Sequence, residues 1–119
     1  MKNISFSLTT PQFLDGSKTV TRRLNWLNLK PGDRLMAVNK CMGFKKGEKP
    51  IKYGEIEIVS VRREPLWWML DEDCPREGFP SMNAVQFGRM FCKAMNCTAL
   101  TEVTRIEFVR VDVAQPEGK

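Results

Sequence analysis

Alternating apolar and polar residues predict five β-strands along this chain of 119 residues. An apolar/polar period of two is typical of a strand, because successive side chains point to opposite faces of the sheet. A loop rich in lysine and glycine, residues 43–52, separates the third strand from the fourth. The expected strands are residues 4–7, 19–24, 34–41, 53–63 and 106–113.

The fourth strand contains a shift in this alternation. Ile56 and Ile58 share one face, whereas Val59 and Val61 share the other. The last strand has a similar shift after Phe108. A shift by one residue exchanges the inner and outer faces, and it indicates a β-bulge. Two long strands with such shifts favour a small, strongly curved barrel over a flat sheet.

Three short helices are expected between the strands. Thr9 and Pro11 suit the first turn of a helix that ends at Gly16. Residues 66–70 predict a short apolar helix in which one of two adjacent tryptophans is buried. Ser81 suits the N-cap of a third helix. The core-facing stripe of that helix consists of Ala84, Phe87, Met90, Phe91, Ala94 and Met95.

Residues 16–23 form the most distinctive motif of the chain, with the sequence GSKTVTRR. Glycine adopts positive φ without steric cost, so Gly16 can turn the chain from the first helix into a strand. Lys18 and Thr21 lie three positions apart, and a regular strand would point them to opposite faces. We therefore expect these two side chains to cooperate only if Lys18 lies in the turn before the strand.

This motif and three others resemble the ASCH family. The family signature is Gly-x-Lys, then Glu or Thr three residues after the lysine and Arg at the fifth. Those positions are Gly16, Lys18, Thr21 and Arg23 here, and further matching segments are residues 30–33, 76–79 and 106–108. ASCH domains have a PUA-like fold, so the resemblance implies an α+β domain with a small, curved, mixed β-barrel and short flanking helices.

Some bacterial ASCH proteins are amidohydrolases that remove the acetyl group from acetylcytidine. The resemblance implies a catalytic site of Lys18, Thr21 and Glu77 in this chain. A lysine desolvated in a pocket can lose its proton and then activate a threonine hydroxyl as a nucleophile. A nearby carboxylate can protonate the leaving amine or orient the attacking group. The simpler alternative is an ion pair between Lys18 and Glu77 that closes the mouth of the barrel.

The distribution of charge favours a polyanionic partner. Residues 1–63 contain 13 Lys and Arg against 5 Asp and Glu, a net charge of +8. Residues 64–119 contain 6 against 9, a net charge of −3. A basic half of this kind is typical of proteins that bind nucleic acid. Because adjacent strand residues face opposite ways, only one of Arg22 and Arg23 is expected to line a common face, and no specific role is expected for the other.

A second hypothesis is therefore a module that binds a nucleotide or RNA without catalysis. Lys18 and Arg23 would contact phosphate or base edges. Trp26 lies in a turn-rich segment and is the expected stacking platform for a base. RNA cleavage at the same basic cleft is a third and weaker alternative, because the chain offers no second general base.

The composition excludes several classes of site. The chain has no histidine, which excludes serine–histidine and cysteine–histidine catalysis. Its four cysteines form no C-x-x-C pair, so we expect buried or half-buried free thiols, no metal site and no cofactor. No apolar run reaches the length of about 18 residues that a membrane-spanning helix needs.

Length and composition predict one domain over residues 1–113, followed by a flexible tail over residues 114–119. The expected location is the cytoplasm. The expected state is a monomer or weak dimer whose partner is a nucleoside or RNA.

Overall fold

The computed structural model describes residues 1–111, which form five strands and four helical segments. The tail expected at residues 114–119 lies outside the described residues. No helix within residues 1–111 is long and apolar enough to cross a membrane. The elements are β1 Asn3–Ser5, α1 Thr10–Leu14, β2 Val20–Arg23, β3 Arg34–Val38, β4 Lys52–Pro65, the 3₁₀ helix η1 Leu66–Trp68, α2 Asp73–Glu77, α3 Ala84–Met95 and β5 Glu102–Arg110.

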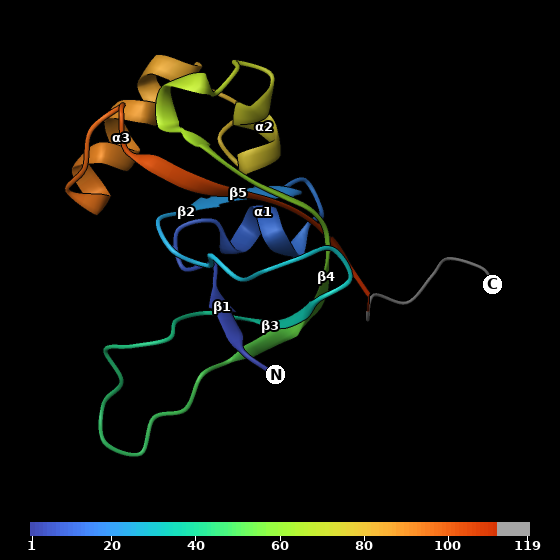
Figure 1. Cartoon of the computed structure of the whole chain (residues 1–119). Helices are drawn as coiled ribbons and strands as arrows, with labels where there is room; N and C mark the ends of the chain where they lie inside the picture. The colour runs from blue at the N-terminus through green and yellow to red at the C-terminus, as the bar shows by residue number, and fades with distance from the viewer. Residues whose placement is uncertain (112–119) are drawn as a thin grey trace.

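β1 and β2 form the two edges of an open, mixed sheet (Figure 1). The strand order is β1-β3-β4-β5-β2, with β1 parallel to β3 and the other neighbours antiparallel. The α+β class and the mixed sheet are confirmed, but the expected closed barrel is wrong. Where a closing ladder of backbone hydrogen bonds would lie, Nη2 of Arg23 donates to the carbonyl oxygen of Ser5 at 2.6 Å. A side chain therefore bridges the gap between the two edges.

The β-bulge expected in the fourth strand is confirmed. The register of β4 against β5 shifts between Ile58 and Ser60. Ile58 is buried before the shift, Val59 is 45% exposed, and Val61 packs against the same core after the shift. The second expected shift is wrong, because Phe108 is buried while Val109 is 49% exposed, which continues the alternation of β5. The pairing of β4 with β5 therefore contains one bulge, in β4.

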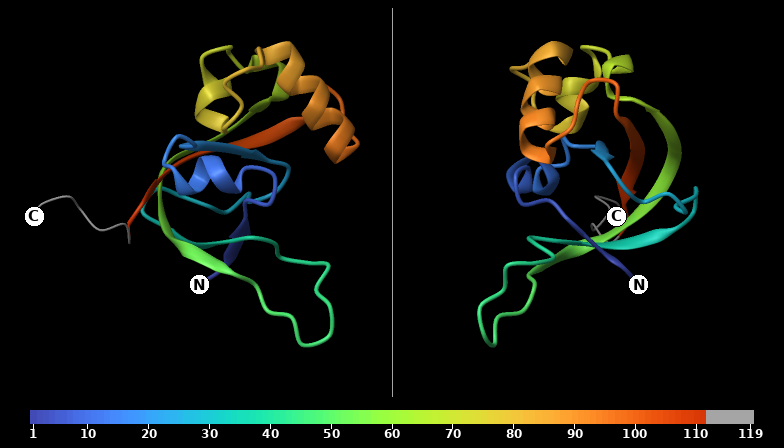
Figure 2. Two further views of the ribbon diagram at one scale, coloured as in Figure 1. Left: turned by 180° about the vertical axis from the view of Figure 1, so that it is seen from behind. Right: turned by 60° about the vertical axis from the view of Figure 1, so that its left-hand side comes forward.

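Two clusters of buried residues flank the sheet. The first includes Phe13 of α1, which lies against the concave side of the sheet (Figure 2) and stacks on Phe6 with ring centroids 4.7 Å apart. The second joins η1, α2, α3 and β5 through Leu66, Cys74 and Phe87 among others. A cavity lies where these two clusters approach each other, and it is lined by Phe6 of the first and Phe87 of the second.

The helices differ from expectation in three respects. The N-cap of α3 is Asn83 and not Ser81, because Asn83 and Gln86 form a reciprocal capping box. Trp67 and Trp68 are 61% and 55% exposed, so neither is buried as expected. The segment around Glu77 is the short helix α2, which is not among the three predicted helices, and it ends at the left-handed residue Gly78.

Substitution of Gly78 by alanine should lower the stability of the protein more than the same substitution at Gly16, which serves as the control. A Cβ at Gly78 would lie 3.2 Å from side-chain carbons of Thr9 and Gln12, and its φ is +98°. Gly16 has a similar φ of +85°, but a Cβ there would meet no atom within 4 Å. We expect Gly16→Ala to lower the free energy of unfolding by about 1 kcal/mol, and Gly78→Ala by roughly 2–3 kcal/mol because steric crowding is added. Equal losses in urea titrations would contradict the crowding.

Candidate functional site

A cavity of about 150 Å³ lies between the two edges of the sheet and the helix α3. Four of the predicted site residues line it: Lys18, Thr21, Arg23 and Glu77. Most of the remaining lining is apolar and includes Phe6, Phe79, Phe87, Met90 and Phe91. The cavity therefore combines a polar, charged side with an aromatic side, an arrangement typical of small-molecule sites.

Lys18 lies in the turn before β2, as its cooperation with Thr21 requires. The left-handed φ of Gly16 ends the chain reversal after α1, and the backbone N–H of Lys18 donates to the carbonyl oxygen of Gln12 at 3.1 Å. β2 begins only at Val20, so the alternation of strand side chains does not apply to Lys18. Lys18 and Thr21 are 4% and 3% exposed and line the same cavity.

Glu77 reaches the cavity from the last turn of α2 and is 2% exposed. Nζ of Lys18 donates to the backbone carbonyl oxygen of Glu77 at 2.6 Å and approaches its Oε1 at 3.4 Å. The other carboxylate oxygen, Oε2, accepts a hydrogen bond from Nη1 of Arg22 at 2.9 Å. One carboxylate thus connects the candidate base to a buried guanidinium.

Burial lowers the pKa of Lys18 from 10.5 to about 8. The charge of Glu77 opposes this shift, while Arg23 and Arg22 add to it. A neutral amine has two N–H donors and one lone pair, and both donors have acceptors on Glu77. The lone pair of the neutral form is therefore available to accept a proton from another group in the cavity.

Thr21 is held by the arginine two residues further along β2. Nε of Arg23 donates to Oγ1 of Thr21 at 3.0 Å, and the guanidinium lies 5.3 Å from the ring centroid of Phe6. Among the described residues, no hydrogen bond joins the Lys18 amine directly to the Thr21 hydroxyl. The arrangement places a hydroxyl, an amine of lowered pKa and a guanidinium around one small volume, which suits acyl transfer.

Arg22 has a structural role that the sequence does not predict, since alternation along a strand predicts no specific role for it when Arg23 faces the site. Arg22 is 3% exposed and pairs with three carboxylates: Glu77 at 2.9 Å, Asp73 at 2.8 Å and Glu64 at 3.2 Å. Asp73 also accepts from Arg105 at 2.8 Å. Of the acidic run at residues 71–73, only Asp73 is buried and pairs with Arg22, and the sequence does not show which of the three carboxylates turns inward.

Asp73 stabilises this buried ion cluster, which comprises Arg22, Glu64, Asp73, Glu77 and Arg105. Burial alone would raise the pKa of Asp73, but hydrogen bonds from Arg105 and Arg22 outweigh burial and hold that pKa well below its usual range. The cluster joins β2, β4, β5 and α2, so it fixes the position of Glu77 relative to Lys18.

Trp26 does not share this cavity. It lines a second cavity of about 690 Å³, together with Lys2 and the segment that follows β2. The predicted binding residues Lys18 and Arg23 are therefore brought together, while Trp26 lies at a separate place. The role of Trp26 as a stacking platform stays a prediction, and a base stacked on Trp26 would lie in the second cavity.

The cysteines are free thiols in the described part of the chain. Cys74 is buried, Cys92 and Cys97 are half-buried, and Cys41 is exposed, contrary to the expectation for all four. Residues 1–111 contain no group of three or more His, Cys, Asp or Glu side chains arranged to hold a metal ion.

Comparison with known proteins supports the fold. No family model and no curated protein matches the chain. Among solved structures, the chain is similar to protein EF3133 from Enterococcus faecalis V583, described by the family model DUF984, with a TM-score of 0.56. The two sequences are 14% identical, and the match covers 92% of this chain and 73% of that one. Similarity at this identity shows a shared small α+β fold, and the ASCH resemblance stays a prediction.

The ion cluster predicts unequal effects for two carboxylate substitutions. Asp73→Asn leaves buried Arg105 without its charged partner and removes one of the three carboxylates that pair with Arg22, and we expect a loss of about 3–5 kcal/mol in the free energy of unfolding. The control is Glu57→Gln, which removes a surface partner of Arg34 at 3.2 Å and should cost less than about 1 kcal/mol. Denaturant titrations measure both losses, and a small loss for Asp73→Asn would contradict the structural role of the cluster.

The lowered pKa of Lys18 predicts a specific dependence of stability on pH. Between pH about 8 and 10.5 the unfolded chain keeps a proton on Lys18 that the folded chain has lost. The free energy of unfolding contributed by Lys18 therefore rises with pH across this window, by about 3 kcal/mol, and is lost as the pH falls through 8. Lys18→Met should lack this rise. A difference between wild type and variant that is constant with pH would contradict the shift.

Proposed function

We propose that this protein binds the base of an N-acylated cytidine in the Lys18–Thr21 cavity and hydrolyses the bond between the acyl group and the base nitrogen. The observation that carries the proposal is the convergence of Lys18, Thr21 and Glu77 on one cavity, each less than 5% exposed. Buried polar side chains are expensive to maintain and are concentrated at functional sites. The ASCH resemblance implies the same three residues.

The size of the cavity supports a pyrimidine as the bound group. An apolar cavity of about 150 Å³ accommodates benzene, a single six-membered ring, and the cavity here has a similar volume. The aromatic wall supplies faces for stacking. The guanidinium of Arg23 supplies N–H donors for a ring carbonyl oxygen. The ribose of a nucleoside would then remain at the mouth of the cavity.

The proposed reaction has two stages. Oγ1 of Thr21 attacks the carbonyl carbon of the acyl group, and its proton passes to the neutral amine of Lys18. The bond between the carbonyl carbon and the cytosine nitrogen breaks, and that nitrogen takes the proton from Lys18. Water then hydrolyses the threonine ester with Lys18 again as the base, which releases the carboxylic acid and restores the Thr21 hydroxyl.

Glu77 and Arg23 assist the two reacting groups. The carboxylate of Glu77, 3.4 Å from Nζ of Lys18, stabilises the ammonium form that exists between the two proton transfers. Because Arg22 also pairs with Glu77, this carboxylate acts as a charge partner of Lys18 and not as the proton donor to the leaving amine. The N–H of Arg23 that reaches Oγ1 of Thr21 orients the hydroxyl and stabilises developing negative charge.

The proposal predicts contrasting activities for two substitutions of Thr21. Thr21→Val keeps the shape of the buried side chain but removes the nucleophile, and we expect the release of cytidine from N4-acetylcytidine to fall by at least roughly 10³-fold. Thr21→Ser keeps the hydroxyl and should retain turnover within about tenfold of wild type. Chromatographic detection of cytidine measures both, and equal activity of the two variants would contradict a nucleophilic Thr21.

A specific observation favours a second candidate, a module that binds a nucleotide or RNA without catalysis. The Lys18 ammonium group pairs with Glu77 through two of its three N–H donors, and such pairing suits a purely structural role. Folded wild-type protein that binds N4-acetylcytidine, both free and within a short RNA, but removes the acetyl group from neither would support this candidate and exclude the hydrolase.

A further inference from the structure

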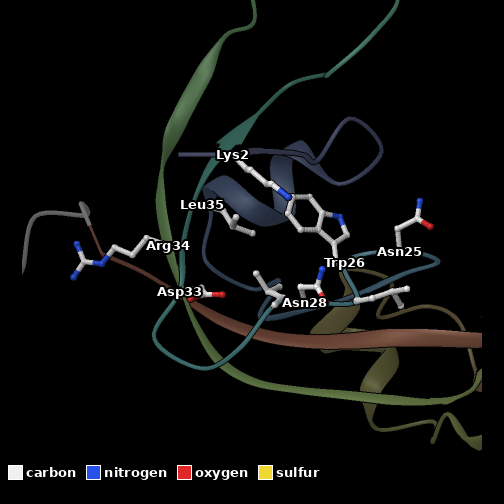
Figure 3. Close-up of a pocket in the computed structure, with 9 residues that line it drawn as sticks. Lys2, Asn25, Trp26, Asn28, Asp33, Arg34 and Leu35 are labelled. Atoms are coloured by element: carbon white, nitrogen blue, oxygen red, sulfur yellow. The ribbon is translucent and has the colours of Figure 1, made fainter.

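The second cavity lies around Trp26 and is open to solvent. Its volume is about 690 Å³, within the range of typical ligand sites. Figure 3 shows the indole of Trp26 with the Lys2 side chain beside it, and Asn25 and Asn28 on the same segment. Arg34 points away from the indole in this view and pairs with Glu57 at 3.2 Å. The cavity therefore presents an aromatic ring, an amine and two amide side chains.

The backbone of Trp26 is in an unfavourable conformation that the sheet maintains. Its φ is +65°, in the left-handed region that bulky side chains rarely adopt. Thr104 of β5 donates to the carbonyl oxygen of Asn25 at 2.5 Å, and Arg63 of β4 donates to that of Leu24 at 3.0 Å. These two hydrogen bonds hold the segment before Trp26. Strain of this kind persists where surrounding structure enforces it, and it is concentrated at ligand sites.

The groups around Trp26 suit a nucleotide. The half-buried indole packs against the core through part of its surface, and Nζ of Lys2 lies 5.9 Å from its ring centroid. A base stacks well on such a ring, and a lysine beside it suits a phosphate. Among the described residues, the side-chain amides of Asn25 and Asn28 have no hydrogen-bond partner. An amide offers a donor and an acceptor side by side, which matches the edge of a base.

Both cavities lie beside the same two chain segments, residues 2–5 and residues 23–26. Arg23, which lines the smaller cavity, donates to the carbonyl oxygen of Ser5. Trp26, which lines the larger one, contacts Lys2. Along both segments the residues that line the two cavities are thus three positions apart, and their Cα atoms are separated by at most about 11 Å. Stacked nucleotides rise about 3.4 Å each along a strand, so bases a few positions apart in one strand can reach both cavities.

We infer that the Trp26 cavity binds a second base, so that the target of this protein is a single-stranded nucleic acid and not a free nucleoside. This inference rests on the proposed function, in which the smaller cavity accepts one pyrimidine. Trp26 stacks on a neighbouring base, Lys2 contacts the phosphate, and the amides of Asn25 and Asn28 bind the edge of the base. The net charge of +5 favours such a polyanion over an uncharged nucleoside.

The test compares two ligands in a Thr21→Val background, in which the ligand is not consumed. One ligand is a short single-stranded RNA with a central N4-acetylcytidine, and the other is free N4-acetylcytidine. The readout is the ratio of the two Kd values. We expect Trp26→Ala to weaken RNA binding by roughly 5- to 150-fold relative to nucleoside binding, the range for loss of one base–aromatic stack. An unchanged ratio would overturn the inference.

Lys2→Glu provides a second variant, because Lys2 is exposed and its replacement does not disturb the core on which Trp26 packs. It should weaken RNA binding and reduce the slope of log Kd against log salt concentration by about 0.7. An unaltered Kd and slope would also count against the second site. The same RNA without acetylation separates the two proposals. Equal Kd values for the two RNAs, with the dependence on Trp26 preserved, would remove the acylcytidine assignment and support the second base site.

Discussion

The position of Glu77 depends on the buried guanidinium of Arg22. Three carboxylates from two elements converge on it, and Arg105 shares one of them. Removing so many charges from water is expensive, and the arrangement is stable only because each charge has a partner at hydrogen-bond distance. α2 has five residues, too few to be stable by itself. The ion cluster therefore anchors this helix to β2 and brings Glu77 within reach of Lys18.

The small cavity lies at the gap between β1 and β2, and Glu77 of this anchored helix lines it. A closed barrel would join β1 and β2 through backbone hydrogen bonds and leave no space between them. Here Arg23 bridges the gap through its side chain, and the remaining volume is the small cavity. Because the cavity is small and much of its lining is aromatic, Lys18 is desolvated, and its pKa falls to about 8. The same geometry that interrupts the sheet thus produces an amine able to act as a base near neutral pH.

Features that depend on neighbouring residues could be predicted from the sequence, whereas those that depend on distant segments could not. The bulge near Ile58 and the turn at Gly16 follow from local alternation and from the conformational freedom of glycine, so both were expected. The N-cap of α3 is Asn83, two residues after the predicted Ser81, because Asn83 forms the capping box with Gln86. The open sheet, the partners of Arg22 and the separation of Trp26 from Lys18 arise from contacts between residues far apart in the chain, on which a pattern of single residues carries no information.

The central claim is that the Lys18–Thr21–Glu77 cavity receives an acylated pyrimidine with its carbonyl carbon against Thr21. A crystal structure of the Thr21→Val variant with N4-acetylcytidine would test this claim most directly. We expect the base to lie against Phe6 or Phe91, and the acetyl carbonyl carbon to be in contact with residue 21. Nζ of Lys18 should lie on the same side of the acetyl group. Electron density for the ligand outside this cavity, or an empty cavity at saturating ligand, would contradict the account.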